Sequence, residues 1–240
     1  MRALPAVRTA ATEPRVTRSS HETNLRPLAP KPNHCVVDVE LQQRYMRKTA
    51  ALVGCRIHSV TYWDVYNYSD EPRSWDFGDW HHAVMGVELL TDQGPVTVTW
   101  TDTFYPYGVE AFPESISRHL LLGEYGPQGW PVSDNPHWRE RSGSPIMSVS
   151  TFWETIHVGP GVCDNVIVSE AETYEVPVAL RLDFAAGPVW MVAGTPQWPN
   201  VENVFIPGDE IMVVFSSARM RKIGFPETDF ISDAPPIILS

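Results

Sequence analysis

Two short hairpin sequences constrain the fold of this chain more than any other feature. Residues 86–100 (GVELLTDQGPVTVTW) alternate apolar and polar side chains on either side of a Gly-Pro turn, which is typical of two half-buried antiparallel strands. A related pattern returns at residues 178–192 (VALRLDFAAGPVWMV). A stretch rich in Ile, Val, Ser and aromatic residues precedes each hairpin, beginning at Gly54 and at Gly143. Matches in the same order at similar separations predict a duplicated unit, although Gly-Pro is also common turn chemistry.

The predicted fold class is therefore all-β with minor α, as two similar antiparallel β units packed as a sandwich or barrel-like pair. A chain of 240 residues buries enough surface for a sizeable core without disulfide bonds. The N-terminal segment has many Pro, Ser, Thr and Arg residues and no apolar period, so its composition predicts disorder. The predicted parts are a disordered basic tail (1–33), a first β unit (34–122), a linker (123–142), a second β unit (143–224) and a C-terminal tail (225–240).

Local patterns place individual elements within these parts. Good helix formers behind Asp38 predict a helix over 38–51. Residues 81–90 are expected to form one strand, and residues 114–122 a two-turn helix that ends before a glycine. The basic run after Ser216 predicts a short helix over 218–223.

Composition excludes several functional classes. The net charge of −11 disfavours binding to phosphate backbones, so nucleic acid is not an expected partner. An acidic body would suit a basic protein partner, although net charge also serves solubility alone. No apolar run approaches the length of a membrane span. The three cysteines are an odd number without a C-x-x-C pair, which favours packing roles in a reducing, cytoplasmic compartment, and no motif calls for a cofactor.

Several short motifs resemble those of uncharacterised bacterial proteins built from two β-rich repeats. The motifs are Ser133-Asp-Asn-Pro-His-Trp138, Gly143-x-x-Ile146, Trp153-Glu154 and Leu180-x-Leu-x-Phe184. The resemblance spans roughly residues 52–216 and concerns structural motifs, so it implies a fold and no catalytic residues. Proteins of this kind are plausible as toxin-neutralising (immunity) or other protein-binding modules, which is an association of function with fold.

The densest group of potential metal ligands is Asp76-Phe-Gly-Asp79-Trp-His81-His82. On an extended segment Asp79 and His81 point to the same face, so they could supply two ligands of a metal site. A third ligand would have to come from elsewhere in the chain. The alternative is a loop-to-strand boundary whose histidines pack beside Trp75 and Trp80. We prefer this alternative, because carboxylate–histidine adjacency without a full ligand set is a weak motif.

Aromatic residues gather in the loops of the first unit, and Trp and Tyr dominate binding hot spots. The predicted binding residues are Trp63, Tyr66, Trp75, Trp80, Tyr105 and Tyr107. The function predicted from these features is a non-catalytic protein-binding module, of immunity type if the resemblance holds. The alternative is a small-molecule enzyme or binding protein whose β cavity is lined by the same aromatic residues and holds a metal. A structural role, in which the rings close the ends of the β units, is equally compatible with the sequence.

Overall fold

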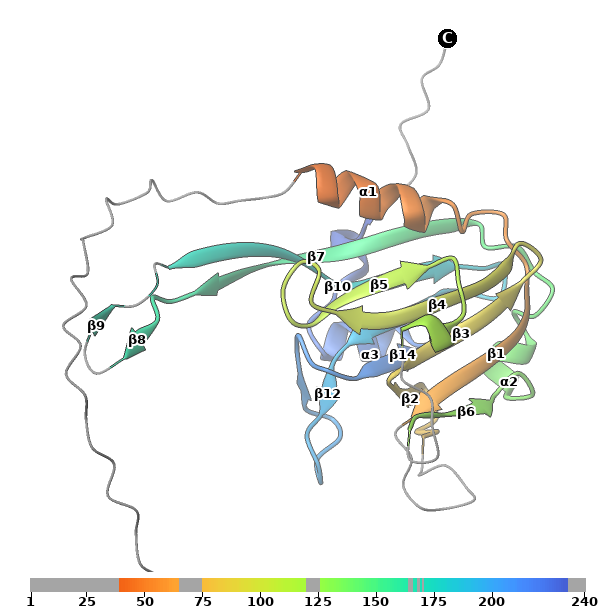
Figure 1. The fold of residues 1–240 in the computed structure, drawn as a ribbon. Helices are drawn as coiled ribbons and strands as arrows, with labels where there is room; N and C mark the ends of the chain where they lie inside the picture. Colours follow the sequence, from red (N-terminus) through yellow and green to blue (C-terminus); the bar gives the residue numbers. More distant parts are fainter. Residues whose placement is uncertain are drawn as a thin grey trace, which may run out of the picture. The chain divides into compact units, whose positions relative to one another are not determined.

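The structure, a computed structural model, is built around a large curled, half-barrel sheet accompanied by few helices (Figure 1). The described residues belong to one unit, residues 33–240. The prediction of an all-β protein with minor α is confirmed. The predicted basic tail, 1–33, lies outside the described residues. These are 39–64, 75–119, 126–163, 166–167, 169 and 171–232.

Eleven strands of the described chain make up the main sheet. Their bounds are Ile57–Asp64 (β1), Trp80–Val84 (β2), Gly86–Thr91 (β3), Gly94–Thr101 (β4), Gly108–Phe112 (β5), Gln128–Pro131 (β6), Ser148–Val158 (β7), Glu172–Asp183 (β10), Val189–Ala193 (β11), Ile211–Val214 (β14) and Ile231–Ser232 (β15). Across the sheet the order is β15-β7-β10-β11-β14-β2-β1-β3-β4-β5, and β6 pairs with the remaining side of β1. Two small hairpins lie apart, pairing Val162–Cys163 (β8) with Val166–Ile167 (β9) and Thr195–Pro196 (β12) with Val204–Phe205 (β13).

Short helices accompany the sheet. The bounds are Val39–Ala50 (α1), Pro136–Arg139 (α2) and Ser217–Lys222 (α3), with 3-10 turns at Ile116–Arg118 (η1) and Glu227–Asp229 (η2). Within the described residues α1 and α3 fall where helices are predicted. None of the described helices has the length and apolar character needed to cross a bilayer.

Two sets of four strands are paired in the same way. The first set is β1-β3-β4-β5 and the second is β7-β10-β11-β14, and every pair in both sets is antiparallel. Positions matched by sequence keep the same register. In the first set Val60 lies opposite Leu89, and in the second Val149 lies opposite Leu182. Glu88 and Thr97 form a pair that corresponds to Arg181 and Trp190. Thr99 and Glu110 correspond in the same way to Val192 and Met212.

The two sets are also joined by reciprocal contacts at their starts. The amide of Gly54 donates to the carbonyl of Ile146 over 2.8 Å, and the amide of Gly143 donates to the carbonyl of Ile57 over the same distance. Gly54 and Gly143 are matched positions, as are Ile57 and Ile146, so one bond is the counterpart of the other. The strands of both predicted β units therefore form one sheet in which matched segments meet about an approximate twofold relation.

Each face of the sheet carries a separate hydrophobic cluster. The larger cluster lines one face across both strand sets, with Val87, Val98, Leu180 and Met191 among its members. The second cluster lies on the opposite face of the second set, beneath α3. The central strands are thus buried on both sides, and their apolar side chains supply most of the burial that stabilises the fold.

One predicted strand is wrong in its continuity. Residues 81–90 form two strands, β2 and β3, because the chain turns at Val84–Gly86. Val84 has a φ of 52° and Gly86 a φ of 153°. A Cβ on Gly86 would lie 2.8 Å from the carbonyl oxygen of Val98, so only glycine fits this turn without displacing backbone. The turn lets β2 pair with β14 while β3 pairs with β1, which joins the two strand sets.

Other predicted segments are more structured or shorter than expected. The range 123–142, predicted as a linker, contains β6 and α2, and α2 buries Trp138 in the larger cluster. The range 225–240, predicted as a tail, begins with buried Phe225 and adds β15 to the sheet edge. In place of the helix over 114–122, the described residues contain η1, capped by Ser115.

Candidate functional site

Strand β2 carries the Asp/His sequence cluster into the middle of the sheet. It lies between β14 and β1, and its alternating side chains point to opposite faces. His81 and His82 are therefore both buried, one on each face. His82 Nε2 lies 2.8 Å from Glu210 Oε2, whereas His81 enters a network of aromatic and polar side chains on the other face.

The network around His81 is a chain of hydrogen bonds. Trp138 Nε1 donates to Tyr62 Oη over 2.6 Å, and Tyr62 Oη lies 2.8 Å from His81 Nδ1. The indole N–H can only donate, so the tyrosine hydroxyl donates in turn to Nδ1, and neutral His81 carries its proton on Nε2. This Nε2 faces Asp76 Oδ1 at 3.7 Å. The chain of hydrogen bonds thus ends at His81 in the core, and the half-exposed Asp76 carboxylate lies just beyond hydrogen-bonding distance of Nε2.

Burial favours the neutral forms of His81 and Tyr62. Desolvation lowers the pKa of His81 to about 4, and the nearby His137 lowers it further while the Asp76 charge opposes the shift. Burial also raises the pKa of Tyr62 well above its usual value. Asp76 accepts hydrogen bonds from the Asn135 side chain and the Gly78 amide, both at 2.9 Å. The arrangement therefore fastens the segment before β2 to α2, and it holds no charged acid–base pair in the interior.

The two residues of the alternative metal site do not come together. Asp79 Oδ1 lies 3.6 Å from Arg219 Nε and forms an ion pair on the opposite side from His81. His81 instead faces Asp76. Among the described residues, no three His, Cys, Asp or Glu side chains gather as metal ligands would.

The aromatic residues predicted to form a binding face contact different parts of the sheet. Trp80 is 0% exposed and stacks on Phe77 with ring centres 4.3 Å apart, so its side chain belongs to the core. The other described members are half-buried. Trp63 packs beside Gly129, Trp75 lies against Tyr62 and His81, Tyr105 against Tyr174, and Tyr107 against Trp100. Tyr66 lies outside the described residues.

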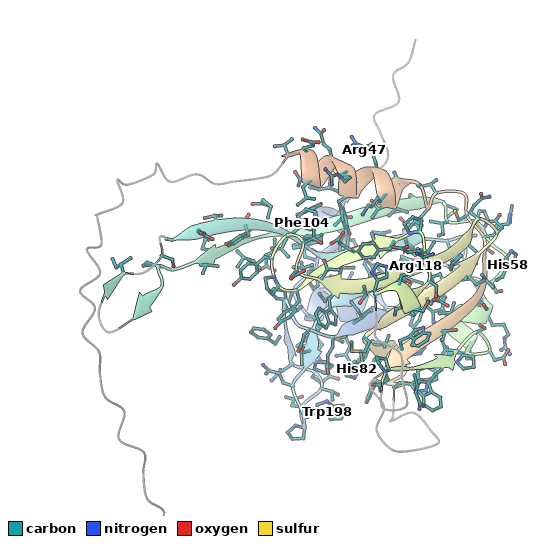
Figure 2. All side chains as sticks on the ribbon, in the orientation of Figure 1. Arg47, His58, His82, Phe104, Arg118 and Trp198 are labelled. Carbon is teal, nitrogen blue, oxygen red and sulfur yellow. The ribbon has the colours of Figure 1, made fainter. Side chains whose placement is uncertain are left out.

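Two aromatic side chains that the sequence analysis did not single out are much more exposed. Trp198 and Phe205 are each 57% exposed and lie on the hairpin that β12 and β13 form (Figure 1). Figure 2 shows Trp198 at the far end of this hairpin, away from the sheet. We call Trp198 and Phe205 the hairpin surface. The signal available in the sequence was a tryptophan between Gln197 and Pro199 in a proline-rich loop, where no apolar period explains its presence.

The hairpin surface is held in place by one buried guanidinium group. Arg219 on α3 makes two hydrogen bonds with the Glu202 carboxylate at 3.0 and 3.1 Å, the bidentate geometry that fixes orientation. The Arg219 guanidinium also lies over the Trp80 ring at 5.7 Å. Lys222 contacts the same carboxylate, and these hydrogen bonds lower the pKa of Glu202. The loop that carries Trp198 is thereby tied to the helix that covers the sheet.

An open pocket of about 400 Å³ adjoins this hairpin. Val204 and Ile206, on either side of Phe205, line it on one side. Glu154 and Thr155 belong to the lining as well, and partial desolvation raises the pKa of the exposed Glu154 carboxyl. The remaining lining is Phe152, Trp153, Ile223, Gly224 and Phe225. Most of the lining side chains are thus apolar, but polar atoms form the larger part of the exposed wall, and Glu154 is the sole titratable side chain among the lining residues.

Neither the models of known protein families nor the curated proteins nor the solved structures contain a match to this chain.

Proposed function

We propose that the chain is a non-catalytic protein-binding module that engages its partner through the hairpin surface and the open pocket beside it. The observation that carries the proposal is the exposure of Trp198 and Phe205, since large aromatic side chains at the surface are typical of binding hot spots. Trp63, Trp75, Tyr105 and Tyr107 are more buried, so the proposed contact lies on the second half of the chain.

The chemistry of the pocket supports binding over catalysis. Its wall combines aromatic and aliphatic side chains with polar atoms, which suits an anchor residue that has an apolar body and a polar end, and such anchors dominate interface energies. General acid–base catalysis needs a titratable side chain positioned at the proton that it transfers. Glu154 is the single titratable group that the described lining offers.

Charge indicates the kind of partner. The chain carries a net charge of −11. Glu154 lies at the pocket, and Glu175 on the neighbouring strand accepts a hydrogen bond from the lining residue Thr155. A basic partner segment would be attracted to this side, because complementary charge raises association rates and suppresses wrong partners.

Two finer interpretations belong to the same proposal. The shared register of the two strand sets supports an origin by internal duplication, as the sequence predicts. The toxin-neutralising role that the resemblance implies is the specific form of protein binding that we propose to test first. A secreted toxin with a basic surface would be the partner that fits the acidic chain.

We expect Trp198→Ala and Phe205→Ala each to weaken partner binding by about 30-fold, as for truncated hot-spot residues. The measurement begins with affinity capture from cells that express the chain naturally, run side by side with wild type and with the double variant. The captured protein is then purified, and its affinity for each single variant is measured by calorimetry. Met147→Ala, which shortens another exposed apolar side chain, is the matched control and should leave the affinity unchanged.

The proposal fails if the double variant captures the same protein with the same affinity as wild type. It fails equally if the double variant captures every protein that the wild-type chain captures. A partner whose affinity changes only with Met147→Ala would place the interface elsewhere on the sheet.

A further inference from the structure

The two matched strand sets differ sharply on the face that lies opposite the larger cluster. At three positions of the same register the first set holds polar side chains where the second holds apolar ones. Thr97, Thr99 and Glu110 of the first set correspond to Trp190, Val192 and Met212 of the second.

On the second set this face is closed by apolar packing. Trp190, Val192 and Met212 are fully buried, and Met220 and Phe225 at α3 cover them. Apolar packing therefore stabilises this face of the sheet in the second set of the same molecule.

On the first set the buried side chains of this face are polar and need hydrogen bonds. Thr97 Oγ1 donates to the carbonyl of Glu114 over 2.8 Å, and Thr99 Oγ1 donates to that of Met85 over 2.6 Å. A satisfied buried hydrogen bond contributes only modestly to stability, and apolar residues of similar shape in its place are often neutral or stabilising. A face that stays polar while its counterpart is apolar indicates a functional demand.

A second open pocket, of about 480 Å³, lies where this polar face meets the β4–β5 connection. Its volume is in the range of small-molecule sites. Trp100 and Tyr107 line it with rings 5.3 Å apart and nearly perpendicular, at 88°, so they form two walls of a corner. Thr99, Thr101, Asp102 and His119 add polar groups to the lining.

The charge at this pocket is negative. Asp102 belongs to the lining, and Glu110, which is 3% exposed, accepts a hydrogen bond from the hydroxyl of the lining residue Thr101. The lining includes neither Lys nor Arg, and in the described part of the chain neither carboxylate forms an ion pair with a basic side chain. A buried carboxylate without a cation is costly, and a bound cation would offset that cost.

We propose that this pocket binds a small organic cation. The ammonium group lies against the faces of Trp100 and Tyr107, where the ring quadrupoles attract it, and Asp102 and Glu110 supply the balancing charge. The site is separate from the hairpin surface and is lined by different residues, so its ligand and the protein partner are recognised independently.

The test uses the full chain and a pair of probes of the same shape. Choline carries a quaternary ammonium group, and 3,3-dimethyl-1-butanol is its uncharged counterpart. Calorimetric titration should detect choline binding and find the neutral probe at least about tenfold weaker, which is the effect of a desolvated cation–π contact. n-Butylammonium tests whether a primary amine is accepted as well.

Variants then locate the bound probe. Tyr107→Leu should weaken choline binding by about tenfold, while Tyr107→Phe, which keeps the ring, should stay within about twofold. Asp102→Asn should weaken binding and reduce its dependence on salt. Leu90→Ala, at an exposed position outside the lining, is the control and should bind choline as wild type does.

Three results would overturn the proposal. One is the absence of binding by both choline and n-butylammonium up to about 20 mM, a concentration that detects even weak fragments. Another is equal binding of choline and its neutral counterpart, which would indicate an apolar or sugar-like ligand. The third is equal affinity of Tyr107→Leu and Tyr107→Phe, with both variants shown to be folded by circular dichroism.

Discussion

Trp80→Ala is expected to lower the free energy of unfolding by about 3–5 kcal/mol, the loss typical of a fully buried tryptophan. Its ring is 0% exposed, stacks on Phe77 and packs with Trp190 and Met212 in the second cluster. It also lies on the strand that joins the two strand sets. The cavity left by the substitution would therefore lie between the sets, where movement of one set alone cannot fill it. Urea denaturation at neutral pH measures the effect.

Trp198→Ala is the matched control for this loss. The same chemical change at a side chain that is more than half exposed should alter the free energy of unfolding by less than about 0.5 kcal/mol. The sequence analysis places Trp80 on a binding face, and its buried position contradicts that prediction. A loss below about 1 kcal/mol for Trp80→Ala would contradict the assignment of Trp80 to the core.

Acid is expected to destabilise the fold through His81. Its pKa is about 4 in the folded chain and 6.5 in a solvated histidine, so the unfolded chain binds a proton that the folded chain does not. Stability from this group is therefore complete above pH 6.5 and is lost as the pH falls toward 4. The difference corresponds to about 3 kcal/mol. The groups that face the ring are Tyr62, Asp76 and His137, and burial outweighs the opposing charge of Asp76.

The variant that isolates this effect is His81→Gln. Its amide oxygen can accept the hydrogen bond from Tyr62, but its side chain does not titrate. Urea denaturation at a series of pH values should give a wild-type loss between pH 6.5 and 4 that exceeds the loss in the variant by about 3 kcal/mol. If the free energy of unfolding falls with pH by the same amount in wild type and variant, protonation of His81 does not destabilise the fold, and the prediction is wrong.

Much of the local structure follows from the sequence, because short-range patterns determine it. The alternation of Val96 and Val98 with Thr97 and Thr99 gives β4, and the helix formers from residue 39 give α1. The turn at Met85 was missed, since Ala83-Val84-Met85 contains no turn signal and the demand for glycine at residue 86 comes from Val98 on another strand. Strands β6 and β15 were missed for a similar reason, as two to four residues become a strand only by pairing with distant ones.

The candidate site was less predictable than the fold. Strand parity predicts Asp79 and His81 on one face, which is wrong because Asp79 pairs with Arg219 on the opposite side. Parity also cannot say that both faces of β2 are covered, which is what buries Trp80. It also cannot choose between two carboxylates: Asp76 reaches His81 because α2 holds it through Asn135, whereas Arg219 from a distant helix draws Asp79 away. Trp198 lies on a loop that is held by the contact between Glu202 and Arg219. No local sequence pattern links these two segments, so the position of the loop could not be predicted.

Hydrogen exchange of the chain with and without its captured partner tests the proposed binding surface most directly. Binding through the hairpin surface predicts slower amide exchange in residues 195–206 and 152–155, with residues 57–64 and 97–101 unchanged. Slower exchange confined to the segments that hold Trp63, Trp75 or Tyr107, with the hairpin unchanged, would contradict it.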